Sequence, residues 1–421
     1  MKKELPLYQQ IIHIIILSLM LTPNLMFNAS VNALSSQLQA MFQNPNFNNL
    51  CYTTTAVPAI FSLIIVAFII DTVGTKVVMP ILQLINLTAT VIAIYAVKNG
   101  SLTLFLVARG IFGLGGETTY TGQSKIFVML LSKQMQPIAY TLAMAAQVAG
   151  DLLAVSLLPL KGSIQNSYYL ILSLQVIGTL CVIFYSFYVD KYQILTQTIT
   201  KAQIIISNET AEEQNINQAK HIIKQKLIST WVQIKALTRW YWCMAICRIL
   251  STAVYKVYDS RSVISLSSIF SYQTSEVKQY IVYQNGLATG LLVLLAFVQY
   301  KLNKIQYVAF LGQACLIASM FIFALGKQRY CCLVICLING IGLGFSISTT
   351  NSMIVSLAGQ GLGASAVGFV YSFRFVLISI LTPIAQKIAM IEPRNNGWMY
   401  VALHIVSMLC LILTIVMKLG F

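Results

Sequence analysis

Five ionisable residues lie inside otherwise apolar stretches of this sequence, and they are its strongest candidates for chemistry: Arg109, Glu117, Asp151, Lys256 and Arg374. A charge in such a stretch is costly, so it normally faces a water-filled cavity or an oppositely charged partner. A carboxylate can meet Arg or Lys through charge-assisted hydrogen bonds, and an ammonium group can meet Glu or Asp. Because both signs occur, the set suits a cavity for a solute that carries both charges.

The spacing of these residues leaves two roles open for Arg374. At a rise of about 1.5 Å per residue, Asp151 and Arg374 lie at nearly equivalent depths in the two halves of the chain. They could pair with each other and latch one conformation, or Arg374 could bind a carboxylate of the solute. Tyr120 follows Glu117 at i+3, which places both on one polar face of a helix.

The elements that hold these residues are predicted to be membrane-spanning helices. The chain has 421 residues, of which 57% are hydrophobic and only 9% charged, too few charges to cover a soluble globule of this size. Apolar runs of roughly 20 residues, the length that spans a bilayer, lie at 11–33, 52–70, 77–97, 102–130, 138–160, 167–188, 240–258, 279–300, 306–325, 330–356, 364–386 and 397–417. We therefore predict an all-α membrane protein with twelve transmembrane helices.

Two short sequences recur at one offset and indicate a duplication. Ala67-Phe68 recurs at Ala296-Phe297, and the tripeptide 113–115 recurs at 342–344. Fold duplication is common in transporters, which place a solute site between the repeats near the bilayer midplane. We predict an N-terminal six-helix bundle at 1–188, a central cytoplasmic loop at 189–239 and a C-terminal six-helix bundle at 240–421.

Loop charges predict the orientation and argue against nucleic acid as a partner. With both termini cytoplasmic, that side collects more Lys and Arg than the opposite side, as the positive-inside rule requires. A cleaved signal peptide within the first thirty residues is the alternative for the N-terminus. The net charge of +16 is scattered over loops and helices without a basic-aromatic patch, so no nucleic acid partner is expected.

The sequence contains no motif for a metal or a cofactor, and we expect neither. Its nine cysteines fall almost entirely in apolar runs, where they are expected to be packing residues. The sequons at Asn28, Asn86 and Asn208 fall in spans or in the cytoplasmic loop, so no glycan is expected on them.

The connection after the second span, AFIIDTVGTK, resembles the loop between helices 2 and 3 of the major facilitator superfamily. Asp71, Gly74 and Lys76 match its pattern and are the expected gating loop. Thr72 and Thr75 stand where the family has arginines, so the full set of ion pairs that latches one state in the family is incomplete.

The fourth span, ARGIFGLGGETTYTGQSK, resembles the family of major facilitator domain-containing protein 1, the lysosomal dipeptide transporter. Arg109, Glu117 and Gln123 match, as do the glycines at 113, 115 and 116. The resemblance implies two six-helix bundles with spans 1, 4, 7 and 10 around a cavity, and a lysosomal dipeptide uniporter that works by alternating access. It also implies a glycosylated single-span accessory protein as a partner.

Other functions remain open at the level of sequence. The chain could be a carrier of another small organic solute, or a structural or accessory subunit of a membrane complex that transports nothing. A membrane enzyme such as an acyltransferase is disfavoured because no His-Asp pair occurs within a span. The predicted substrate-binding residues are thus Arg109, Glu117, Tyr120, Gln123, Asp151, Lys256 and Arg374.

Overall fold

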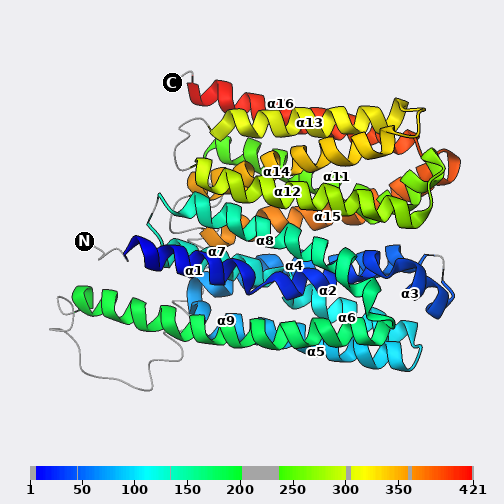
Figure 1. Ribbon diagram of the computed structural model, residues 1–421. Coiled ribbons are helices and arrows are strands. Elements are labelled where there is room, and N and C mark those ends of the chain that lie inside the picture. Colours follow the sequence, from blue (N-terminus) through cyan, green and yellow to red (C-terminus); the bar gives the residue numbers. More distant parts are fainter. Residues whose placement is uncertain are drawn as a thin grey trace.

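Every regular element in the described part of the chain is a helix (Figure 1). The structure is a computed structural model that describes residues 6–44, 46–132, 134–201, 237–299, 305–358 and 363–419. A chain in lipid has no water to satisfy its backbone, and a helix satisfies nearly all of its own hydrogen bonds. This explains why such an apolar sequence forms helices throughout.

The first half makes six crossings. They are α1 (Leu7–Leu19) with α2 (Thr22–Ala33), α4 (Phe47–Val73), α5 (Thr75–Lys98), α6 (Leu102–Gly115) with α7 (Thr118–Leu130), α8 (Gln136–Leu157) and α9 (Ile164–Lys201). The short helix α3 (Ser35–Phe42) and a 3-10 turn, Leu158–Lys161, lie between crossings.

The second half makes another six crossings. They are α11 (Arg239–Phe270), α12 (Thr274–Gln299), α13 (Ile305–Leu325), α14 (Cys331–Ala358), α15 (Gly363–Ile391) and α16 (Asn395–Leu419). The predicted twelve-helix fold is therefore confirmed. Ten of the segments are long and apolar enough to cross a membrane on length and composition alone. The other two crossings are the broken pair α6 and α7 and the charge-bearing helix α11.

The two halves meet along four central helices. α4 packs against α15, and α8 packs against α12. Figure 1 shows α5 and α9 on one outer side of the molecule and α13 and α16 on the other. At Gly368 of α15, an added Cβ would lie 2.6 Å from the Ala67 Cβ of α4, so the absence of a side chain allows the two helices to approach closely.

Several helix limits differ from those predicted. α11 runs on to Phe270 instead of ending near 258, and α12 begins at Thr274 instead of 279. The predicted span 102–130 is broken into two helices at Gly116 and Glu117. The reason for the first two differences is that charged residues in these parts of the helices lower their hydropathy, although two of them, Asp259 and Lys278, line the interior.

The central loop predicted at 189–239 falls mostly outside the described residues. Its first part continues helix α9 as far as Lys201, and residues 202–236 are not described. Both ends of the chain lie at one end of the bundle, with α3 at the opposite end (Figure 1). We call these the termini end and the α3 end. The domain limits and the cytoplasmic side of the membrane stay predictions.

Candidate functional site

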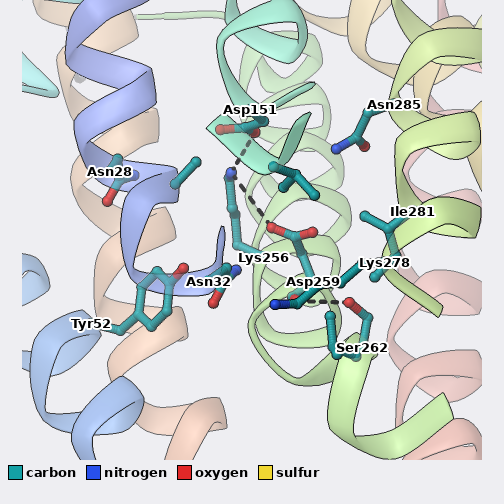
Figure 2. Close-up of a pocket in the computed structure, with 13 residues that line it drawn as sticks. Asn28, Asn32, Tyr52, Asp151, Lys256, Asp259, Ser262, Lys278, Ile281 and Asn285 are labelled. Atoms are coloured by element: carbon teal, nitrogen blue, oxygen red, sulfur yellow. Dashed lines mark hydrogen bonds and ion pairs between the residues drawn. The ribbon is translucent and has the colours of Figure 1, made fainter. Parts of the chain in front are cut away.

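Two ion pairs join the halves in the middle of the molecule. Arg374 of α15 donates from Nη2 to Glu117 Oε2 at 2.9 Å. Lys256 of α11 donates from Nζ to Asp151 Oδ2 of α8 at 3.1 Å (Figure 2). All four residues were predicted as site residues, and the structure brings them together between the halves.

The partners differ from the pairing considered from sequence. Arg374 pairs with Glu117, and Asp151 pairs with Lys256, so Asp151 and Arg374 are not paired with each other in this structure. Counting residues along a helix gives depth only, and lateral position depends on which helices are neighbours. α15 packs against α4 and α7, and the break before α7 places Glu117 within reach of Arg374.

The ion pairs line two cavities that share residues. The first cavity lies around Asp151 and Lys256 and is also lined by Asn28, Asn32, Tyr52, Asp259, Ser262, Lys278 and Asn285 (Figure 2). The second lies around Glu117 and Arg374 and shares Asn28, Tyr52 and Lys256 with the first. The first has a volume of about 30 Å³, and a water molecule needs roughly 10–15 Å³ on this scale. A solute larger than a few waters therefore requires the halves to move apart.

The charges that line the cavities balance. Glu117, Asp151 and Asp259 supply three carboxylates, and Lys256, Lys278 and Arg374 supply three cations. Lys256 also lies 4.0 Å from Asp259, one helical turn further along α11. Both signs are thus present within one small space, where a solute of either or both signs would find a partner.

Arg109 lies behind the cavities rather than in them. It is 0% exposed and donates to the Phe27 carbonyl oxygen at 3.1 Å and to Asn28 Oδ1 at 2.7 Å. Asn28 in turn donates to Glu117 Oε1 at 3.4 Å. Arg109 therefore positions Asn28, and through it Glu117, at the wall of the cavities.

Tyr120 and Gln123 also lie outside the lining of the two cavities. The Tyr120 ring packs on Tyr371 of α15, with ring centroids 5.2 Å apart. Gln123 donates from Nε2 to the Leu17 carbonyl oxygen of α1 at 2.5 Å. The first contact joins the halves, and the second holds α7 against α1.

Asp71 of the predicted gating loop contacts the opposite half at the termini end of the interface. Asp71 accepts from Lys125 at 2.6 Å and, through Oδ2, from the Ser365 backbone N–H at 3.0 Å. Asp71 thereby links α4 to the beginning of α15. Gly74 has φ +98°, a conformation that favours glycine, and it forms the turn into α5. The Lys76 Nζ lies 5.5 Å from the centre of the Phe187 ring.

Polar contacts also close the α3 end. Gln386 of α15 is hydrogen-bonded to Asn46 and Asn49, which begin α4. Lys278 of α12 donates to the Ala33 carbonyl oxygen of α2 at 3.4 Å. Contacts between the halves thus occur at both ends of the interface.

Sequence reasoning missed several residues of the cavity lining. Asn28, Asn32 and Asn285 are neutral amides, which give little signal within an apolar run. Lys278 was assigned to a loop because its helix begins earlier than predicted, and Asp259 was placed at the far end of the seventh span as a solvated residue. Continuing the helical period from Lys256 to Asp259, three residues on, would have extended the helix and placed both side chains on one face.

Comparisons with known proteins show which family this chain belongs to and which solved structures share its fold. The sequence matches the Major Facilitator Superfamily over residues 15–383. A search of curated proteins found no match. Among solved structures, the human organic anion transporter MFSD10 (TETRAN) is similar with a TM-score of 0.71 at 10% identity, covering 97% of this chain and 100% of that one.

Two sugar transporters have a similar fold. FucP in the outward conformation has a TM-score of 0.69 at 12% identity and covers 96% of this chain and 99% of its own. The proton:xylose symporter XylE, bound to 6-bromo-6-deoxy-D-glucose, has a TM-score of 0.69 at 12% identity, with coverage of 95% and 94%. Identities this low show a shared fold and not a shared substrate. The sequence match over most of the chain shows that this protein belongs to the Major Facilitator Superfamily, and hence that it is a membrane transporter of some small solute.

Proposed function

We propose that this transporter carries small peptides, above all dipeptides and including cationic ones, out of a lysosome-like lumen by facilitated diffusion. The observation that carries the proposal is the cavity lining of three carboxylates and three cations. A zwitterionic dipeptide presents one ammonium and one carboxylate group, and each would meet an opposite charge there. The resemblance of the fourth span to lysosomal dipeptide transporters supports the same substrate class and compartment.

Alternating access gives the two ion pairs a role in this function. Both pairs join one half to the other, so they hold the halves together beside the cavities. A dipeptide that enters from one side would offer its own charges to Glu117, Asp151, Lys256 and Arg374. It would replace contacts between the halves, so that the carrier could open and close without leaving a charge unpaired.

A sugar or an organic anion is the main competing substrate. MFSD10 is an organic anion transporter, and FucP and XylE carry sugars. An anion would meet the three cations but would leave the three carboxylates without a partner, and a neutral sugar gains little from paired buried charges. No tryptophan is among the described residues that line the two cavities. The lining therefore favours a solute with both charges.

Transport into proteoliposomes tests the proposal. Purified protein is reconstituted with unlabelled dialanine inside, and labelled dialanine is added outside. We expect labelled dialanine to accumulate transiently inside the liposomes. Unlabelled dialanine or lysyl-alanine added outside should abolish this accumulation, and fucose or p-aminohippurate should not. Protein-free liposomes are the control. Saturable sugar or anion flux without dipeptide flux would end the dipeptide reading. No flux of any solute, together with a stoichiometric protein partner, would favour an accessory subunit.

The accessory partner is a separate part of the proposal. Asn86 is 0% exposed and Asn28 lines the cavities, so neither sequon is placed to carry a glycan, and Asn208 lies outside the described residues. A carrier in a protease-rich lumen would then depend on a glycosylated single-span protein for protection. We expect the half-life of this chain in cells to fall when such a partner is deleted. A half-life that no co-purifying glycoprotein affects would contradict this part.

A further inference from the structure

The four charges that join the halves differ in what else they contact. Glu117 also accepts from Asn28 at 3.4 Å. The Arg374 guanidinium lies 4.4 Å from the centre of the Tyr371 ring on its own helix. Lys256 lies 4.0 Å from Asp259, also on its own helix. Each of these contacts stays within one half and can survive when the halves separate.

Asp151 is the exception. Within the described part of the chain, its side chain has a hydrogen bond or ion pair with Lys256 alone, which belongs to the opposite half. When the halves separate, Lys256 and Asp259 move together on α11 and keep each other as partners. Asp151 is left as a carboxylate in the cavity without a cation, and an unpaired charge at this depth is strongly unfavourable.

The walls around Asp151 offer further hydrogen-bond acceptors. Asn32 and Asn285 line the same cavity, and the Oδ1 atom of each is buried without a hydrogen-bond partner among the described residues. Asn285 is only 2% exposed. One carboxylate with two amide oxygens in the same cavity lining suits a group that carries a positive charge and several N–H donors. A primary ammonium group has three N–H donors and one positive charge.

We propose that Asp151 is the receptor for a primary ammonium group of the transported solute, and that Lys256 vacates Asp151 by moving onto Asp259 as the halves separate. Lys256 and the solute ammonium then compete for one carboxylate. The closed empty carrier has Lys256 on Asp151, and the loaded carrier has the solute there. This inference rests on the proposed function for the kind of solute and adds which residue binds its cationic end.

Binding measurements on two matched probes test the receptor. Dialanine has a free ammonium group, and N-acetyl-dialanine has the same carboxylate without it. We expect wild-type protein to bind dialanine more tightly by about tenfold or more, the scale of a hydrogen bond to a charged group. Asp151→Asn should remove this preference. Glu276→Gln, which alters a carboxylate outside both cavities that pairs with Arg329, is the control and should retain it.

The exchange of partners makes a sharper prediction for Asp259. Asp259→Asn removes the second partner of Lys256, so Lys256 should stay on Asp151 and dialanine affinity should fall by about tenfold. In a Lys256→Gln background there is no competing cation, so Asp259→Asn should then have little effect. If Asp259→Asn lowers dialanine affinity equally in the wild-type and Lys256→Gln backgrounds, Lys256 does not exchange between Asp151 and Asp259. If Asp151→Asn keeps the wild-type preference for dialanine over N-acetyl-dialanine, Asp151 is not the ammonium receptor.

A conformational readout separates this inference from the dipeptide proposal. Spin labels on α4 and α15 report the distance between the halves without any solute. Asp151→Asn should favour the separated state, Asp259→Asn should favour the closed state, and both should be silent in Lys256→Gln. n-Butylamine has a primary ammonium group and n-butanol does not. If the shifts occur, n-butylamine alone of the two favours separation, and dialanine does not bind, then the dipeptide proposal fails and this inference stands. If acidification separates the halves and n-butylamine does not, Asp151 binds a proton and not an ammonium group, which overturns this inference.

Discussion

Glu117 is shared by two arginines that belong to different halves of the molecule. Arg374 contacts its Oε2 directly, and Arg109 acts on its Oε1 through Asn28. Arg109, Asn28 and Glu117 belong to the same half, so their contacts can persist during transport, whereas the contact with Arg374 has to break. Glu117 consequently keeps the hydrogen bond from Asn28 within its own half when the halves separate.

The first prediction concerns this pair. Arg374→Gln or Glu117→Gln alone leaves one charge buried without its partner, so each should destabilise the closed state by about 3–5 kcal/mol. The double change removes both charges and should recover much of that loss. Thermal unfolding and dialanine flux, measured in the wild type, the two single variants and the double variant, give the coupling between Arg374 and Glu117.

A different outcome would return Arg374 to the role of a solute ligand. In that case the double variant would be as defective in flux as Arg374→Gln alone. Affinity for the carboxylate end of the solute would fall in both, while the spacing of the halves without solute would not change.

The charged residues of the site could be predicted from sequence, and their contacts could not. A charge in an apolar run is conspicuous because it is costly, which identified Arg109, Glu117, Asp151, Lys256 and Arg374. Partner choice depends on the lateral order of helices, which a single sequence does not contain. Asn28, Asn32 and Asn285 were missed because an amide in an apolar run is common in helix packing as well.

At the level of elements, α11 shows why hydropathy gave the wrong helix limits. Arg248, Lys256, Asp259 and Arg261 lie within this one helix. Asp259 and Arg261 lower the hydropathy beyond residue 258, so the predicted span ended there, yet Lys256 and Asp259 line the cavity. The break between α6 and α7 was missed because residues 102–130 form one apolar run and were predicted as one continuous span.

The second prediction concerns the close contact of α4 and α15. Gly368→Leu places a side chain where even a Cβ would meet the Leu63 carbonyl oxygen at 2.7 Å, so the helices should move apart and the closed state should be disfavoured. The spacing of spin labels on α4 and α15 measures this. Gly286→Leu on α12 is the matched control, because a Cβ there meets nothing within 4 Å. Equal spacing in the two variants would show that the contact does not control closure.

At the level of the whole molecule, separate contacts close the two ends of the interface. Asp71 and Ser365 close the termini end, and Asn49 and Gln386 close the α3 end. Alternating access requires each set to open while the other stays closed. The apolar runs and the faint repeat were sufficient to predict twelve helices. They carried no information on which contacts close each end, since these join residues far apart in sequence.

The third prediction uses the α3 end. A disulfide between Asn49→Cys and Gln386→Cys should hold that end closed and stop dialanine flux, and a reducing agent should restore it. Each single cysteine variant is the control and should carry dialanine before and after oxidation. Full flux in the oxidised double variant would mean that this end does not open during transport.

The balance of three carboxylates and three cations in the cavities has an electrical consequence. Moving one elementary charge through a membrane potential of 100 mV changes its energy by about 2.3 kcal/mol, but the empty carrier moves a balanced set. Its return step should therefore be independent of voltage, as should the passage of zwitterionic dialanine. Lysyl-alanine adds one positive charge and should generate a current in vesicles clamped with valinomycin and potassium. Equal voltage dependence for the two peptides would show that the charges of the cavity do not move as a neutral group.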